Sequence, residues 1–122
     1  MNSVDIESKT IDGIGIIYPG PYLNQLRGER IEKVCHEMLA KGVRQMVINF
    51  EETELVNSIG ISILLGVIEA INDANGKLIL SNLSASNREL FDMLGLLSCL
   101  QVEATEEVAL AKMREEFELI AS

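Results

Sequence analysis

Strand-like and helix-like segments alternate along this chain of 122 residues, and the alternation restricts its fold more than any other feature. Alternating apolar and polar residues predict a strand over 4–10, and Asp12-Gly13 predicts a tight hairpin turn into a second strand over 14–18. The segments predicted after this hairpin are a helix over 23–41, a strand over 43–50, a helix over 58–74, a strand over 77–83, a helix over 86–94, a strand over 99–102 and a helix over 105–118. The resulting β-β-α-β-α-β-α-β-α order predicts a single α/β domain over residues 1–122: a mixed β-sheet, begun by an antiparallel hairpin, with four helices packed against it.

Short signals refine this pattern. The consecutive apolar residues Met46-Val47-Ile48 predict an interior strand that is buried on both faces. Ser86 is followed three residues later by Glu89, which predicts a capping box at the start of a helix.

The composition excludes several classes of function. The formal net charge is −9, which argues against a nucleic-acid partner because phosphate groups are bound by clustered Lys and Arg. The first residues lack the basic and apolar regions of a secretion signal, and the longest apolar stretch, 61–71, carries Glu69 and is too short to span a membrane. We therefore expect a cytoplasmic protein. Cys35 and Cys99 have no metal-ligand spacing and are interpreted as buried free thiols in a reducing compartment.

The sequence offers no catalytic constellation. His36 is the only histidine, and it stands between Cys35 and Glu37 on a predicted helix, where adjacent residues point to different faces. The glycines do not form a phosphate-binding motif. A response-regulator receiver would need an acidic pair after its first strand, and none follows Tyr18.

The helix predicted over 58–74 is apolar on two sides. One stripe, which can cover a sheet, consists of Ile61, Leu64, Leu65, Ile68 and Ile71. A second stripe consists of Ile59, Ile63, Val67 and Ala70. Packing against a neighbouring helix is an open explanation for Val67 and Ala70. Ile59 and Ile63 lie near the start of the helix, and we interpret them as a partner-binding surface.

Ser58 opens this helix, and the residues alone allow two roles for it. Its hydroxyl is suited to cap the helix by accepting a hydrogen bond from a backbone N–H of the first turn. The alternative is a phosphorylation site, because a phosphate there would meet the positive end of the helix dipole. It would also add negative charge next to Glu51, Glu52 and Glu54 and to an apolar docking patch.

Four stretches together resemble the STAS domains, whose type members are the bacterial anti-sigma factor antagonists. The stretches are NSIGI at 57–61, the Asn75-Gly76 turn, KLIL at 77–80 and LFDMLGL at 90–96. In the family, Asp-Ser-x-Gly-Leu/Ile opens a helix, an Asn-Gly or Gly-Gly turn precedes a buried strand, and Leu-Phe-x-x-x-Gly-Leu follows. The resemblance covers nearly the whole chain and includes its β-β-α start.

The resemblance implies a binding module and not an enzyme, with no cofactor, metal or catalytic residue in this chain. Antagonists of this kind dock on an anti-sigma factor that is itself a serine kinase, and they thereby free a sigma factor for transcription. The kinase, which binds the ATP and magnesium, phosphorylates the serine that matches Ser58, and a serine phosphatase reverses the modification. The implied partner-binding residues are Asn24, Asn57, Ser58, Ile59, Gly60 and Ile63.

Two positions depart from the family pattern. Asn57 stands where the family has Asp, and Asn24 replaces the acidic residue that usually precedes the first helix. The loss of two negative charges beside Ser58 keeps a second function open: a STAS subunit that is not phosphorylated and that serves a lipid-transporting ABC system or a stressosome-type scaffold. Formation of a homodimer also remains open.

Overall fold

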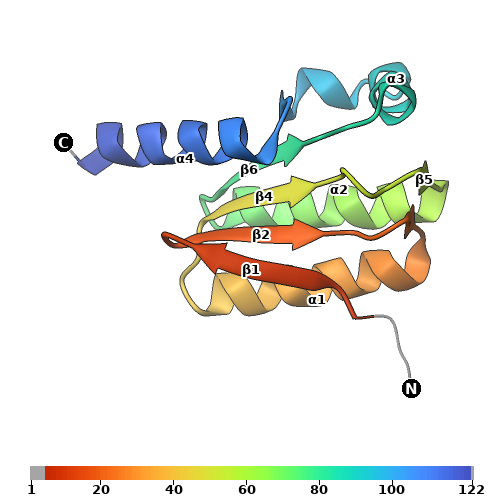
Figure 1. The fold of residues 1–122 in the computed structure, drawn as a ribbon. Coiled ribbons are helices and arrows are strands. Elements are labelled where there is room, and N and C mark those ends of the chain that lie inside the picture. The colour runs from red at the N-terminus through yellow and green to blue at the C-terminus, as the bar shows by residue number, and fades with distance from the viewer. Residues whose placement is uncertain (1–4, 122) are drawn as a thin grey trace.

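The computed structural model describes residues 5–121 and shows an open sheet with helices on both faces (Figure 1). Its elements are β1 (Glu7–Ile11), β2 (Ile14–Tyr18), β3 (Tyr22–Leu23), α1 (Gln25–Ala40), β4 (Gln45–Asn49), β5 (Leu55–Val56), α2 (Ser58–Asp73), β6 (Lys77–Ser81), α3 (Ala85–Met93), the 3-10 helix η1 (Leu96–Ser98), β7 (Gln101–Glu103) and α4 (Glu106–Ala121). Within the described part of the chain, no helix is both long and apolar enough to cross a membrane.

The main sheet has five strands in the order β1-β2-β4-β6-β7. β1 and β2 pair antiparallel, and every other neighbouring pair is parallel. The hairpin turn has positive φ angles at Asp12 (53°) and Gly13 (79°), as a two-residue turn that matches the strand twist requires. This arrangement confirms the mixed sheet and the antiparallel start that the sequence predicts.

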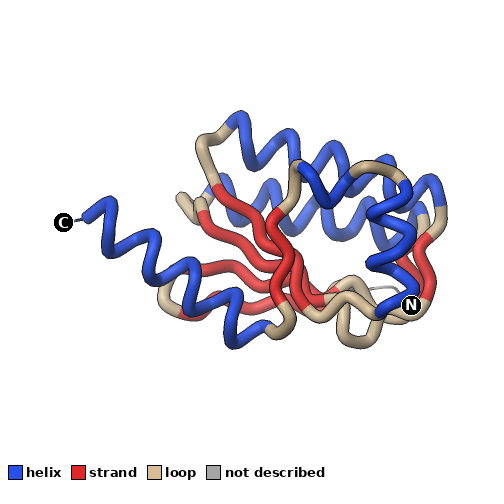
Figure 2. The backbone as a smooth tube through the Cα atoms, turned by 90° about the horizontal axis from the view of Figure 1, so that it is seen from above, coloured by secondary structure: helices blue, strands red, loops and turns tan. Residues whose placement is uncertain are grey.

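Two apolar cores lie on opposite faces of the sheet. α1, α2 and α3 cover one face and α4 covers the other, as Figure 2 shows. Along β4, Met46 and Ile48 belong to the first core, whereas Val47 belongs to the second. Side chains of a strand alternate between faces, so a strand between two helix layers is apolar at every position. The prediction of an interior strand at this place is confirmed.

The sequence analysis missed a second, two-stranded parallel sheet. Its strands β3 and β5 pair Tyr22 with Leu55 and Leu23 with Val56. As a result α1 begins at Gln25, two residues later than predicted, because the preceding residues are extended.

Three finer predictions are wrong or only partly right. The predicted capping box at Ser86 is absent, and Ser84 caps α3 by accepting a hydrogen bond from the Asn87 backbone N–H (3.0 Å). The helix starts earlier because the Asn87 side chain is buried and bonded to the Thr53 carbonyl (2.9 Å). Both cysteines are free thiols, but only Cys35 is buried, and Cys99 lies exposed before β7. The first strand, predicted over 4–10, is β1 (Glu7–Ile11), so it begins and ends later than predicted, and residue 4 lies outside the described residues.

Candidate partner-binding site

The small β3–β5 sheet brings the N-termini of α1 and α2 together at one end of the molecule (Figure 1). Asn24 directly follows β3, and Asn57 directly follows β5, so the strand pairing places the two helix starts next to each other. The Asn57 backbone N–H donates a hydrogen bond to the Leu23 carbonyl (3.0 Å), which extends the pairing to the first turn of α2.

Both helices are capped by asparagine. Asn24 Oδ1 accepts a hydrogen bond from the Arg27 N–H (3.1 Å), and Asn57 Oδ1 accepts one from the Gly60 N–H (2.8 Å). The other end of the Asn57 amide donates to the Tyr22 hydroxyl (3.2 Å). Asparagine caps a helix about as well as aspartate, so the two departures from the family pattern keep the cap and remove its charge.

Ser58 is therefore not the cap of α2, and that interpretation is wrong. It is the first residue of the helix, and its side chain is exposed. The cap falls on Asn57 because the backbone of that residue is still extended (φ −101°, ψ 172°) as it leaves β5. The Ser58 hydroxyl therefore does not cap α2.

Gly60 has a structural reason to be glycine. It is buried, and a Cβ at this position would lie 2.3 Å from the Leu23 carbonyl oxygen. That distance is far below a van der Waals contact, so any side chain here would push α2 away from β3. Gly60 therefore allows α2 to approach β3 closely, and as a buried residue it does not form the surface of the predicted partner site.

The second apolar stripe of α2 is divided between packing and exposure. Ile63 is half-buried and lies against α1, where a Cβ built on Gly28 would come within 3.0 Å of its Cδ1 atom. Val67 is buried in the core, whereas Ile59 is 49% exposed. The stripe exists because α2 packs against both the sheet and α1, and its first residue, Ile59, is the most exposed of the four. Leu65, predicted to face the sheet, is exposed.

A shallow hollow of about 500 Å³ lies between the two helix starts. It is lined by Tyr22, Asn24, Gln25, Leu26, Glu29, Asn57 and Ile59. Three of the predicted residues, Asn24, Asn57 and Ile59, therefore meet in one surface feature. Tyr22 and Leu26, which are 39% and 46% exposed, were missed. Leu26 lies outside the buried apolar stripe of α1. An apolar residue outside that stripe was the sequence signal that could have indicated its exposure.

The hollow rests on a fixed base. The Thr53 hydroxyl donates a hydrogen bond to the Gly20 carbonyl (2.8 Å), and the Asn87 side chain binds the Thr53 carbonyl from α3. Thr53 is itself buried. These contacts tie the loop before β5 to the loop before β3 and to helix α3, so the surface at the start of α2 is held in place before a partner binds.

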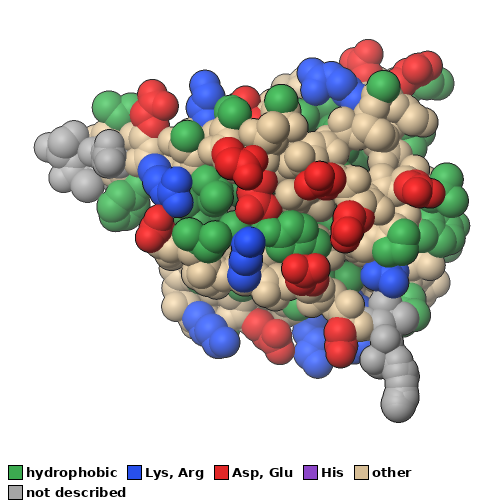
Figure 3. All heavy atoms as spheres, viewed as in Figure 1, with side chains coloured by type: hydrophobic (Ala, Val, Ile, Leu, Met, Phe, Trp, Pro, Cys, Tyr) green, Lys and Arg blue, Asp and Glu red, His purple; other side chains and the backbone are tan. Residues whose placement is uncertain are grey.

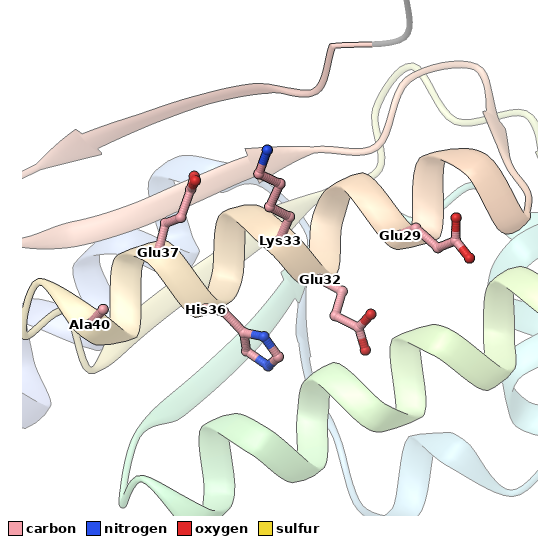
Figure 4. Close-up of a pocket in the computed structure, with 6 residues that line it drawn as sticks. All are labelled: Glu29, Glu32, Lys33, His36, Glu37 and Ala40. Atoms are coloured by element: carbon pink, nitrogen blue, oxygen red, sulfur yellow. The ribbon is translucent and has the colours of Figure 1, made fainter.

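The outer face of α1 forms another open hollow, of about 440 Å³, around His36 (Figure 4). Figure 4 shows Glu32 and His36 on one side of the helix and Lys33 and Glu37 on the other, so these side chains do not converge. Among residues 5–121, no three His, Cys, Asp or Glu side chains are grouped to hold a metal ion.

Burial, with a smaller contribution from Glu32, raises the pKa of Cys35 to about 11, which keeps its thiol protonated.

These features define a small α/β domain that has an open hollow, exposed apolar side chains and an exposed serine at the start of α2. The chain belongs to the STAS domain family, whose sequence profile matches residues 5–109. The family inferred from the motifs is thereby confirmed.

Two relatives are similar over most of their length. BtrV of Bordetella bronchiseptica, a candidate anti-sigma factor antagonist, is 28% identical over 104 residues, which cover 85% of this chain and 90% of BtrV. The anti-sigma-B factor antagonist of Staphylococcus aureus is 26% identical over 106 residues, which cover 87% of this chain and 98% of that protein.

Solved structures share the fold. A candidate anti-sigma factor antagonist from Thermotoga maritima has a TM-score of 0.82 at 17% identity, with 89% of this chain and 94% of that chain covered. The Bacillus cell fate determinant SpoIIAA in its phosphorylated form has a TM-score of 0.71 at 24% identity, with 88% of this chain and 98% of that chain covered.

Proposed function

We propose that this chain is an anti-sigma factor antagonist, which binds an anti-sigma factor through the surface at the start of α2 and thereby releases a sigma factor for transcription. The proposal depends on one observation above all. The β3–β5 pair fixes two helix N-termini side by side and leaves Ser58 and Ile59 exposed at the edge of a hollow. The two relatives named as antagonists, or candidates for that role, support the same function.

We further propose that reversible phosphorylation of Ser58 switches this binding. A phosphate on Ser58 would sit at the positive end of the α2 dipole, beside N–H groups that have no acceptor within the helix. The helix would tolerate it, since the first turn of α2 contains no acidic residue. A partner that covers Ile59 would not tolerate the phosphate, because binding would remove nearly two negative charges from water. The fold would survive phosphorylation while the complex dissociates.

The two capping residues are uncharged, and this affects the proposed switch. Because Asn24 and Asn57 carry no charge, the unmodified surface between the helices has only Glu29 as a charged lining residue. Phosphorylation would then place negative charge directly at the start of α2, where the capping residue itself carries none. The kinase partner would supply ATP and magnesium, and a serine phosphatase would reset the switch in the bacterial cytoplasm.

Affinity purification from the source cell tests the proposal, with wild type, Ser58→Ala, Ser58→Asp and Ile59→Asp as baits. Ser8→Asp is the matched control, because Ser8 is an exposed serine on the edge strand β1. We expect an anti-sigma factor with wild type, Ser58→Ala and Ser8→Asp, and at least a tenfold loss with the other two baits. Mass spectrometry of the Ser58 peptide from growing cells should find a phosphorylated fraction.

Two other outcomes would contradict the proposal. If Ser58→Asp retains the anti-sigma factor, binding is constitutive and Ser58 is not a switch. If every bait instead recovers a subunit of a lipid-transporting ABC system or components of a stressosome, the chain is a non-phosphorylated interaction subunit.

A further inference from the structure

A surface hollow lies at the opposite end of the parallel strands from Ser58. Its volume is about 660 Å³, and it is formed where α4 extends past the sheet (Figure 1). Leu110 and Met113 of α4 pack on the sheet and are buried. Phe117, one turn further along the same face, lines the hollow and is 62% exposed. The apolar face of α4 therefore continues beyond the surface that covers it.

Three turns keep the hollow open on the side of the sheet. Gly13, Gly42 and Gly76 line it just before β2, β4 and β6. Gly13 and Gly42 have positive φ angles (79° and 93°), and nothing lies within 4 Å of a Cβ built on either of them. Glycine is favoured by the backbone at these two positions, and neither position adds a side chain to the space.

The residues that line the hollow carry one more positive than negative charge, in a protein of net charge −9. Arg44, Lys77 and Arg114 line it together with only two acids, Asp12 and Glu116. Arg114 binds Asp12 (3.0 Å), and Lys77 binds Glu116 (2.9 Å), so these charges compensate each other. Figure 3 shows hydrophobic side chains next to both Lys or Arg and Asp or Glu side chains near this C-terminal end.

Arg44 is the third positively charged residue that lines the hollow. Its Nη1 atom donates hydrogen bonds to the carbonyls of Leu39 (2.8 Å) and Val43 (3.0 Å). Among the side chains that the structure describes, no carboxylate is paired with it. The two backbone bonds hold the guanidinium through one nitrogen and leave its other nitrogens available to an anion. A carboxylate or phosphate matches that fork of donors.

We propose that this hollow binds a small amphipathic anion, with the carboxylate or phosphate at Arg44 and the apolar body against the exposed ring of Phe117. The volume lies within the range of small-molecule sites, and an apolar wall with a few convergent polar groups is typical of them. A symmetric pair of copies that met through this hollow would place two surfaces of net positive charge against each other, which disfavours a second copy as the occupant. The site is distinct from the Ser58 surface and does not depend on the proposed function.

Titration with octanoate, followed by amide chemical shifts of the ¹⁵N-labelled chain, tests this inference. We expect saturable shifts at Gly13, Gly42 and Gly76, with no comparable shifts at Ser58 or Ile59. Octan-1-ol is the matched neutral probe, and it should bind at least tenfold more weakly because it lacks the charge. Added salt should weaken octanoate binding, since Arg44 is exposed to solvent.

Variants identify the groups that bind the probe. Arg44→Gln and Phe117→Ala should each weaken octanoate binding by about tenfold, from the lost charge-assisted bonds and the lost apolar contact. Arg88→Gln, at an exposed position of α3, is the control and should bind like wild type. Phe117→Ala removes only an exposed side chain, so the test stands even if Arg44→Gln fails to fold.

Three results would overturn the inference. They are an absence of saturable shifts at the three glycines, equal binding of octanol and octanoate, and full binding by both variants. If the wild type is a dimer by light scattering, Phe117→Ala is a monomer and octanoate changes nothing, the hollow is covered by a second copy. These readouts need no anti-sigma factor, so they can fail while the proposed function holds.

Discussion

Gly60→Ala offers the sharpest test of how the site is built. The added methyl group would lie 2.3 Å from the Leu23 carbonyl oxygen and 2.8 Å from its carbonyl carbon. Both atoms belong to the backbone of β3, which is itself paired with β5, so neither can move alone. To relieve the contact, the start of α2 must move away from β3 and strain the Asn57 N–H bond to the Leu23 carbonyl.

The expected loss follows from opposing terms. Overpacking typically costs about 1–3 kcal/mol, and weakening of one backbone hydrogen bond adds about 1 kcal/mol. The better helix propensity of alanine offsets up to about 1 kcal/mol of this. We therefore expect Gly60→Ala to lower the free energy of unfolding by about 1–3 kcal/mol. Gly66→Ala, in the same helix with nothing within 4 Å of the added methyl, should raise it by about 0.5–1 kcal/mol.

Urea denaturation followed by circular dichroism measures both variants. With a urea dependence of about 2 kcal/mol per molar, the middle of the usual range, the two midpoints should differ by about 1–2 M. Gly60→Ala should also weaken capture of the partner, because the Ser58 surface moves with the start of α2. If Gly60→Ala is as stable as Gly66→Ala, the close approach of α2 to β3 is not the reason for the glycine, and the argument is refuted.

Further predictions separate the roles of neighbouring residues. Asn57→Ala should lower the free energy of unfolding by about 1 kcal/mol through loss of the cap, and Ser58→Ala by less than about 0.5 kcal/mol; equal losses in urea denaturation would mean that Ser58 shares the capping. Ile63→Asp should cost about 2 kcal/mol or more, because it places a charge against α1, whereas the exposed Ile59→Asp should stay within about 0.5 kcal/mol of wild type in the same assay. Burial raises the pKa of Cys35 to about 11. A thiol reagent near neutral pH should therefore modify only the exposed Cys99 quickly in the folded protein. Two fast reactions would contradict this.

Periodicity and turn chemistry were sufficient to predict the main architecture. The apolar run at β4 indicated a strand covered on both faces, and the Asp12-Gly13 pair indicated the hairpin. Both are local signals, because the side-chain period and the φ preference act within a few residues. The order of strands and helices, and the start of α2 near Ser58, followed from the same reasoning.

The geometry of the site depended on contacts between distant segments. Strands of two residues, such as β3 and β5, have no periodicity to recognise, so their pairing was invisible in the sequence. Ile63 looked like a surface residue because its burial depends on Gly28 of α1, which lets the two helices approach closely.

The sequence by itself determined that a helix begins near residue 58 with an asparagine, a serine and a glycine at its start. Only the tertiary structure decided what each of them does. Asparagine and serine are equally good caps, and Asn57 takes that role because its backbone is bonded to Leu23 of β3 and is still extended. The same contact buries Gly60 and leaves Ser58 exposed, because the strand pairing fixes which side of the first turn faces the protein.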